Sequence, residues 1–141
     1  MIDQLTVFLE NSKGRLTAMC RVLGEAGVQM HALALADTTD YGIVRIICDD
    51  PDGAAEALKA AGFHATLTKV VAVEVPHVPG GLAKVFGALD DNDVNIEYSY
   101  CFAGADNGAT VAFKAPESAM RTLESAGFKV LHPGDLYKTE E

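Results

Sequence analysis

The chain has no tryptophan, no long apolar run and no excess of positive charge. No stretch approaches the ~20 apolar residues that a membrane-spanning helix requires, and the first residues lack the basic region and apolar run of a signal peptide. We therefore expect a cytoplasmic protein with no membrane partner. Because 20 acidic residues face 11 basic ones, the net charge of −9 has the wrong sign for holding a phosphate backbone, and we expect no nucleic-acid partner.

Motifs for metals and for common catalytic sites are also missing. The only cysteines, Cys20, Cys48 and Cys101, are scattered among apolar neighbours, which in a reducing compartment indicates core residues rather than disulfides. There is no Cys-x-x-Cys pair, the histidines share no metal-site spacing, and no serine lies in a nucleophile elbow. Residues 104–108 predict a turn and lack the ending of a phosphate loop. We therefore predict no metal, no cofactor and no catalysis.

What the sequence does contain is an internal repeat. One set of residues recurs after 66 positions: Val7, Gly14, Leu16, Leu23 and Val28 return as Val73, Gly80, Leu82, Leu89 and Val94. A second set recurs after 65 positions: Pro51, Ala54, Leu58, Ala61, Gly62 and Phe63 return as Pro116, Ala119, Leu123, Ala126, Gly127 and Phe128. A long period present only twice indicates two copies of a small domain rather than a solenoid. We predict one domain over residues 1–70 and a second over residues 71–141.

The first copy follows a simple order of elements. Residues 5–9 alternate as a half-buried strand does, and the apolar spacing from Leu16 to Leu23 predicts a helix. Residues 28–36 and 43–48 predict a hairpin around a turn at 38–42. A second helix opens with Pro51, and a strand-like run from Phe63 continues to residue 75, past the boundary between the copies.

This order predicts the fold class α+β, with two ferredoxin-like βαββαβ domains. Each would hold an antiparallel four-stranded sheet with two helices on one face, because right-handed crossovers place both helices on the same side. The absence of a linker favours docked domains. Uncovered sheet edges favour pairing of the two copies or of two chains, and we expect a homodimer.

One loop keeps its chemistry in both copies. It runs from Glu10 to Leu16 in the first copy and from Pro76 to Leu82 in the second. Glycine lets the loop turn tightly, and the first-turn N–H groups of the following helix favour an anion such as a carboxylate. Gln29 and Asn95 are amides at matching positions after that helix, and their oxygens could accept bonds from an ammonium group. A zwitterion, that is, an amino acid, would suit such a pocket.

At these residues the chain resembles the ACT domains, regulatory modules that bind amino acids. The resemblance covers both copies through the strand order, the Pro-Gly-x-Leu type of loop and the Val-Asn-Ile segment, and it is similar overall to small tandem ACT proteins often loosely labelled acetolactate synthase regulatory. The resemblance implies that a ligand lies between two domains, where Asn11 could face Asn95 and His77 could face Gln29. The ligand-binding residues so implied are Asn11, Ser12, Lys13, Gly14, Arg15, Leu16, Gln29, His77, Gly80, Gly81 and Asn95. We expect the first loop to bind better, because it keeps the amide and adds a lysine.

Simpler interpretations of the same residues stay open. Asn11 and Ser12 could cap the helix that follows, Gln29 and Asn95 could bond the backbone at a strand end, and His77 could be an exposed loop histidine.

These observations predict a non-catalytic amino-acid sensor that acts in trans on a metabolic enzyme. The alternatives are a structural oligomerisation module without a ligand and a small cofactor-free enzyme with His77 or His31 as acid or base.

Overall fold

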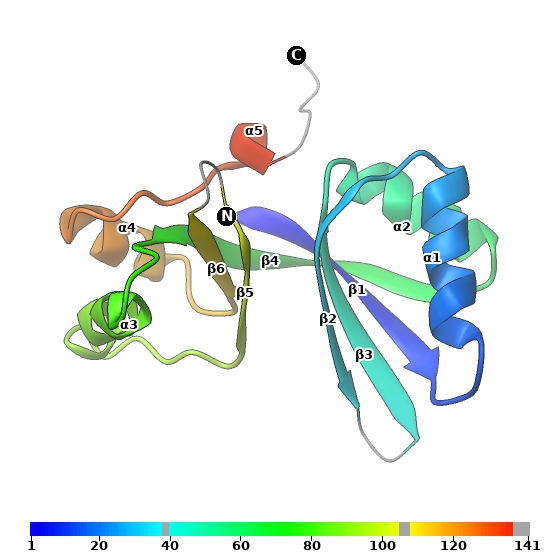
Figure 1. Cartoon of the computed structure of the whole chain (residues 1–141), viewed down its shortest axis with the longest axis horizontal. Helices are drawn as coiled ribbons and strands as arrows, with labels where there is room; N and C mark the ends of the chain where they lie inside the picture. The colour runs from blue at the N-terminus through cyan, green and yellow to red at the C-terminus, as the bar shows by residue number, and fades with distance from the viewer. Residues whose placement is uncertain (38–39, 105–107, 137–141) are drawn as a thin grey trace. The chain divides into compact units, whose positions relative to one another are not determined.

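The computed structural model describes residues 1–37, 40–104 and 108–136, and the chain divides into two compact units. The N-terminal unit holds Asp3–Thr68 and Leu136, and the C-terminal unit holds Met1–Ile2 and Lys69–Asp135. The strands are β1 (Ile2–Glu10), β2 (Met30–Asp37), β3 (Tyr41–Cys48), β4 (His64–Val75), β5 (Ser99–Ala103) and β6 (Ala109–Phe113), and the helices are α1 (Arg15–Glu25), α2 (Pro51–Ala60), α3 (Gly81–Asp90), α4 (Ser118–Ser125) and α5 (Pro133–Leu136) (Figure 1). The predicted turns at 38–42 and 104–108, and the end of the predicted second domain, include residues outside the described ranges.

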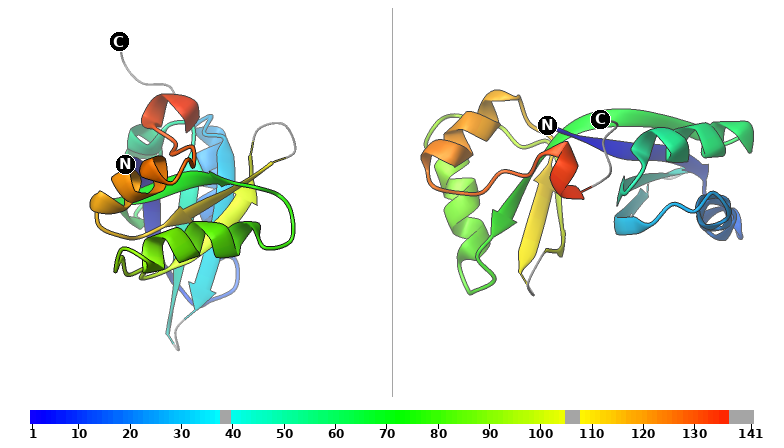
Figure 2. Two further views of the ribbon diagram at one scale, coloured as in Figure 1. Left: turned by 90° about the vertical axis from the view of Figure 1, so that its left-hand side faces the viewer. Right: turned by 90° about the horizontal axis from the view of Figure 1, so that it is seen from above.

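The N-terminal unit has the strand order β2-β3-β1-β4. β3 pairs antiparallel with both β1 and β2, and Val44 of β3 lies opposite Val7 and Leu35. This is the predicted split βαβ arrangement, in which α1 and α2 share one face of the sheet. The right-hand view of Figure 2 shows both helices on the same side of β1.

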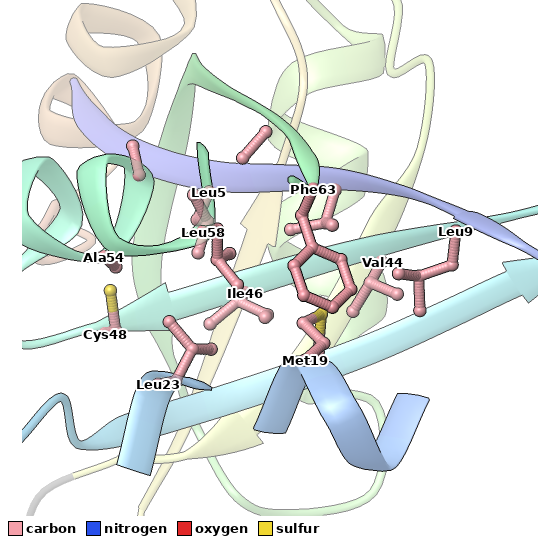
Figure 3. Packing of buried hydrophobic residues seen from close by; sticks show 13 residues of the cluster. Leu5, Leu9, Met19, Leu23, Val44, Ile46, Cys48, Ala54, Leu58 and Phe63 are labelled. Atoms are coloured by element: carbon pink, nitrogen blue, oxygen red, sulfur yellow. The ribbon is translucent and has the colours of Figure 1, made fainter. Parts of the chain in front are cut away.

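The core of this unit lies between that face and the two helices. Alternate residues of β1 and β3, such as Leu5 and Ile46, point toward Met19 and Leu23 of α1 and Leu58 of α2, and all of these side chains are fully buried (Figure 3). The period of two in the strands meets the helical stripe of α1, as the sequence predicts.

The C-terminal unit repeats this plan with a shorter sheet. β6 pairs antiparallel with β4 and β5, and Val111 lies opposite Val73 and Cys101. Helices α3 and α4 pack against β4 and β6 through a second core cluster that includes Val85, Leu89, Ala119, Leu123 and Phe113.

The last position of this second sheet is reduced to an isolated bridge between Val73 and Val130. Two backbone bonds hold it: Glu74 N–H donates to Lys129 O at 2.9 Å, and Leu131 N–H donates to Ala72 O at 2.8 Å.

Two strands begin later than the sequence predicts. β2 starts at Met30 rather than at residue 28, and the Val-Asn-Ile segment at 94–96 precedes β5, which starts at Ser99. Among the described residues, no helix is long and apolar enough to cross a membrane.

Candidate functional site

The first loop joins β1 to α1 through a left-handed glycine. Gly14 occupies the N-cap of α1 with φ 88°, and no side chain caps the helix. Asn11 N–H donates to Asp40 O at 3.2 Å, and Ser12 N–H donates to Glu10 O at 2.8 Å. The loop is therefore held by backbone bonds, and the side chains of Asn11 and Ser12 stay exposed rather than capping α1.

The second loop, between β4 and α3, has the same form. Gly80 occupies the N-cap of α3 with φ 84°, again without a side-chain cap. Val78 N–H donates to Pro76 O at 2.9 Å, and Gly81 N–H donates to Val78 O at 3.0 Å. A Cβ atom on Gly81 would overlap the carbonyl oxygen of Pro76, so this position admits only glycine without a backbone shift. The extra glycine of the second copy thus has a structural reason.

In each loop the start of the helix offers backbone donors. The first i→i−4 bond of α1 runs from Ala18 N–H to Gly14 O at 2.9 Å, and that of α3 runs from Lys84 N–H to Gly80 O at 3.1 Å. The first N–H of each helix is already used, because Arg15 N–H donates to Ser12 O at 3.4 Å and Gly81 N–H donates to Val78 O at 3.0 Å. The next N–H groups of the first turn lie at the positive end of the helix dipole, an environment that favours an anion such as a carboxylate.

The second loop lines a cavity of about 420 Å³. His77, Gly80 and Gly81 contribute from the loop, and Cys101 and Ala109 contribute from β5 and β6. Sequence reasoning found the loop residues and missed Ala109. It predicted Cys101 to be a core residue, which is wrong because Cys101 is exposed. The pairing of β5 with β6, in which Ala103 lies opposite Ala109, is what brings these residues beside the loop.

A second cavity, of about 440 Å³, lies beside the first loop in the N-terminal unit. Its lining residues are Phe8, Glu10, Arg15, Tyr41, Gly62, Phe63 and His64. The Cζ atom of Arg15 lies 4.5 Å from the centroid of the Phe63 ring, and the rings of Phe8 and His64 meet edge to face with centroids 5.3 Å apart. Glu10 and Arg15 belong to the loop that the sequence analysis singled out, and of these two only Arg15 is among the implied ligand-binding residues.

Gln29 immediately precedes β2 and bonds to local backbone. Its Nε2 donates to Met30 O at 3.1 Å, and its N–H donates to Asp49 Oδ1 at 2.9 Å. These bonds agree with the simpler interpretation of Gln29 as a residue that satisfies the backbone at a strand end, although its amide oxygen is not used in them.

Asn95 lies in the irregular segment before β5 and is exposed. Asp93, shortly before it, has φ 56°, a left-handed value at a residue other than glycine. The sequence predicts that Asn95 lies at the start of a strand. This prediction is wrong, because Asn95 precedes β5.

In the N-terminal unit the first loop and Gln29 lie at opposite ends of the sheet. Met30, next to Gln29, pairs with Cys48, whereas Glu10, next to the first loop, pairs with Tyr41. Tyr41 and Cys48 are seven residues apart along β3, a distance of about 23 Å. The N-terminal unit therefore cannot place the first loop and Gln29 on one small ligand.

Two small α+β units in tandem, each with a glycine-capped helix start at a loop cavity, define a pair of ferredoxin-like domains. The chain belongs to the ACT domain pair family, whose sequence profile matches residues 1–130. This confirms the resemblance seen in the loop and strand pattern.

Solved structures agree with this assignment. Protein BT0572 from Bacteroides thetaiotaomicron is 41% identical, with a TM-score of 0.89 over 97% of this chain and 96% of that chain. The regulatory subunit of aspartate kinase from Thermus thermophilus, in a ligand-free form, is 20% identical, with a TM-score of 0.66 over 88% of this chain and 91% of that chain. The corresponding subunit from Thermus flavus is 20% identical, with a TM-score of 0.62 over 89% and 92%. No curated protein sequence matches the chain significantly.

Proposed function

We propose that this protein is a non-catalytic regulatory module that binds a free amino acid and acts in trans on a metabolic enzyme. The observation that carries the proposal is the repeated loop, in which Gly14 and Gly80 begin a helix that no side chain caps. Uncapped N–H groups at an exposed loop are available to a ligand carboxylate.

The family assignment supports the same role. The chain shares its fold with proteins described as regulatory subunits of aspartate kinase. An amino acid would place its carboxylate on one loop and its ammonium on an amide oxygen, with Asn95 partnering the first loop and Gln29 the second. Binding would favour one arrangement of the domains, and a coupling of ~1–3 kcal/mol is enough to regulate a partner enzyme.

A thermal-shift screen of the protein against every proteinogenic amino acid, followed by calorimetry on each hit, tests the proposal. A ligand that binds only the folded state must raise its stability, so we expect saturable stabilisation by one or a few amino acids. Flat curves across the panel would refute amino-acid binding.

Single variants then test the assigned residues. Asn11→Ala and Asn95→Ala should each weaken a hit at the first loop, and His77→Ala and Gln29→Ala should weaken a hit at the second. Lys59→Ala, at the end of α2, is a control that should leave affinity unchanged. Unchanged affinity in all four site variants would refute the assigned pockets while leaving amino-acid binding in place.

A structural oligomerisation module is the second candidate, and the edge strand β2 favours it. Leu33 and Leu35 of β2 are 41% and 51% exposed. An apolar edge strand invites pairing with another chain, so we propose a homodimer whether or not a ligand binds. If the amino-acid screen is flat and the protein is a dimer, this second candidate replaces the first.

A further inference from the structure

The two units differ at a pair of equivalent positions. In the N-terminal unit these positions lie on β1 and β4, and in the C-terminal unit they lie on β4 and next to the bridge between Val73 and Val130. In the N-terminal unit Phe8 and His64 form an aromatic pair. The repeat aligns them with Glu74 and Lys129, which form an ion pair at 3.6 Å between Nζ and Oε1. An exposed ion pair is a common surface contact, whereas an aromatic pair bordering a cavity is an apolar wall.

The units also differ at the residue after the loop glycine. The N-terminal unit has Arg15 and the C-terminal unit has Gly81. Arg15 stacks on Phe63, and its Nε atom is buried with no hydrogen-bond partner among the described residues. A buried donor without a partner is costly, which makes an acceptor from a ligand favourable at this position.

We propose that the 440 Å³ cavity of the N-terminal unit is a binding site for an aromatic carboxylate, which adjoins the first loop and shares Arg15 with it but does not include Asn11. The carboxylate accepts hydrogen bonds from the guanidinium of Arg15, a charge-assisted contact with a planar, forked donor. The ring packs among the aromatic side chains of Phe8, Phe63 and Tyr41, which line the same cavity. A cavity of this size fits a small ligand.

Glu10 lines the same cavity and sets which aromatic carboxylate fits. Its carboxylate attracts an ammonium group and repels a second negative charge. An aromatic amino acid and an aromatic acid without an amino group share the ring and the carboxylate, and Glu10 favours the amino acid. The site does not depend on amino-acid binding at the loops.

Calorimetric titration with hydrocinnamate, L-phenylalanine and cyclohexylpropionate tests the site. Both aromatic compounds should bind the wild type, and the saturated ring of cyclohexylpropionate should bind several-fold more weakly because it lacks aromatic stacking. L-phenylalanine should bind more tightly than hydrocinnamate, because Glu10 attracts its ammonium group. Tighter binding of hydrocinnamate would overturn the role given to Glu10. Equal affinity for the saturated ring, or no binding by either aromatic compound, would overturn the proposal.

Variants place the binding in this cavity. Arg15→Gln should weaken hydrocinnamate at least about tenfold because it removes the charge-assisted donor. Arg21→Gln on the exposed side of the same helix removes the same charge outside the cavity and should have little effect. Asn11→Ala should also leave hydrocinnamate binding unchanged, which separates this cavity from the first loop site.

A second aromatic variant covers the case in which Arg15→Gln does not fold. Phe8 is 42% exposed, so Phe8→Leu should keep the fold while removing one aromatic wall. It should weaken hydrocinnamate several-fold and narrow its preference over cyclohexylpropionate. Wild-type affinity in both Arg15→Gln and Phe8→Leu would show that the ligand binds elsewhere and would overturn the assignment.

Discussion

At the scale of single residues, the two loops have the same backbone conformation and differ in the side chain that the position after the glycine can accept. Gly14 and Gly80 adopt the same left-handed conformation at the start of a helix. The next residue is Arg15 in one unit and Gly81 in the other, and only Gly81 faces a carbonyl oxygen that leaves no room for a side chain. The sequence alone does not show why a second glycine follows Gly80, because the approach of Pro76 is visible only in three dimensions.

Substitution of Gly81 tests this packing. Gly81→Ala should lower the free energy of unfolding by about 2 kcal/mol or more, because the new methyl group forces the Pro76 carbonyl to move. Gly87→Ala in the same helix meets no atom within 4 Å and should instead gain up to about 1 kcal/mol. Urea unfolding of both variants measures the difference, and equal stability of the two would show that the loop accommodates a Cβ.

Cys48, another single residue, makes the stability of the folded state depend on pH. Burial in the core raises the pKa of its thiol from 9.0 to about 11, with smaller contributions from a backbone hydrogen bond at Asp50, which lowers the pKa, and from the charges of Asp49 and Asp50, which raise it. The folded state therefore keeps a proton that the unfolded state loses between these values. This contribution to stability is fully present below pH 9.0 and is lost as the pH rises toward about 11.

Cys48→Ala should reduce the loss of folding stability between pH 9.0 and about 11. The wild type should lose ~2 kcal/mol more than the variant as the pH rises through this range, since each pKa unit corresponds to about 1.4 kcal/mol. Cys101→Ala, which removes an exposed thiol, serves as the control and should follow the wild type. Unfolding midpoints at several alkaline pH values measure these slopes, and parallel curves for all three proteins would contradict the role given to Cys48.

At the scale of elements, apolar periodicity predicted helices better than it predicted where strands begin. The stripe from Leu16 to Leu23 lies within α1, and the run past the boundary between the copies became β4. The segment at 94–96 alternates like a strand yet lies outside β5. Its pairing partner β6 ends at Phe113, opposite Ser99, and only isolated backbone bonds such as Glu97 N–H to Lys114 O continue the contact. Strand bounds depend on the partner strand, which one segment of sequence does not reveal.

The edge strand β2 carries a prediction about association. Leu33 and Leu35 lie opposite Ile46 and Val44, so they continue the apolar face of β3 to an exposed edge. Leu35→Glu should convert the proposed dimer to a monomer, because it places a charge in an apolar contact. Val78→Glu changes an exposed apolar residue of the second loop and should leave the dimer intact.

Light scattering coupled to size exclusion measures the mass of each variant. A dimer in both variants would show that chains associate elsewhere, and a monomer in the wild type would refute the homodimer.

At the scale of the whole molecule, the repeat predicted the number of units and their common plan, and it predicted less about their differences. Equivalent positions such as Phe8 and Glu74 align readily in sequence. The structural roles of Phe8 and Glu74 depend on their neighbours in space, because His64 completes an aromatic pair in one unit and Lys129 completes an ion pair in the other. Comparing Phe8 with Glu74 and His64 with Lys129 in the aligned copies could have indicated the aromatic cavity.

The net charge of −9 bears on association of whole chains. Two chains that carry this charge repel one another, and dissolved salt screens the repulsion. We therefore expect the dissociation constant of the proposed dimer to fall several-fold between low and physiological ionic strength. Sedimentation equilibrium across a salt series measures it, and a dissociation constant that rises with salt would indicate attractive ion pairs at the interface instead.

The carbonyl of Pro76 beside Gly81 limits how the two copies can change. An arginine in the C-terminal unit at the position of Arg15 would place its Cβ against that carbonyl, so the second copy could gain this cation only if the backbone of the loop moved. The copies are therefore not interchangeable, and swapping ligand preference between them would require rebuilding the loop. The aromatic carboxylate proposed for the first unit should accordingly bind with a stoichiometry of one per chain.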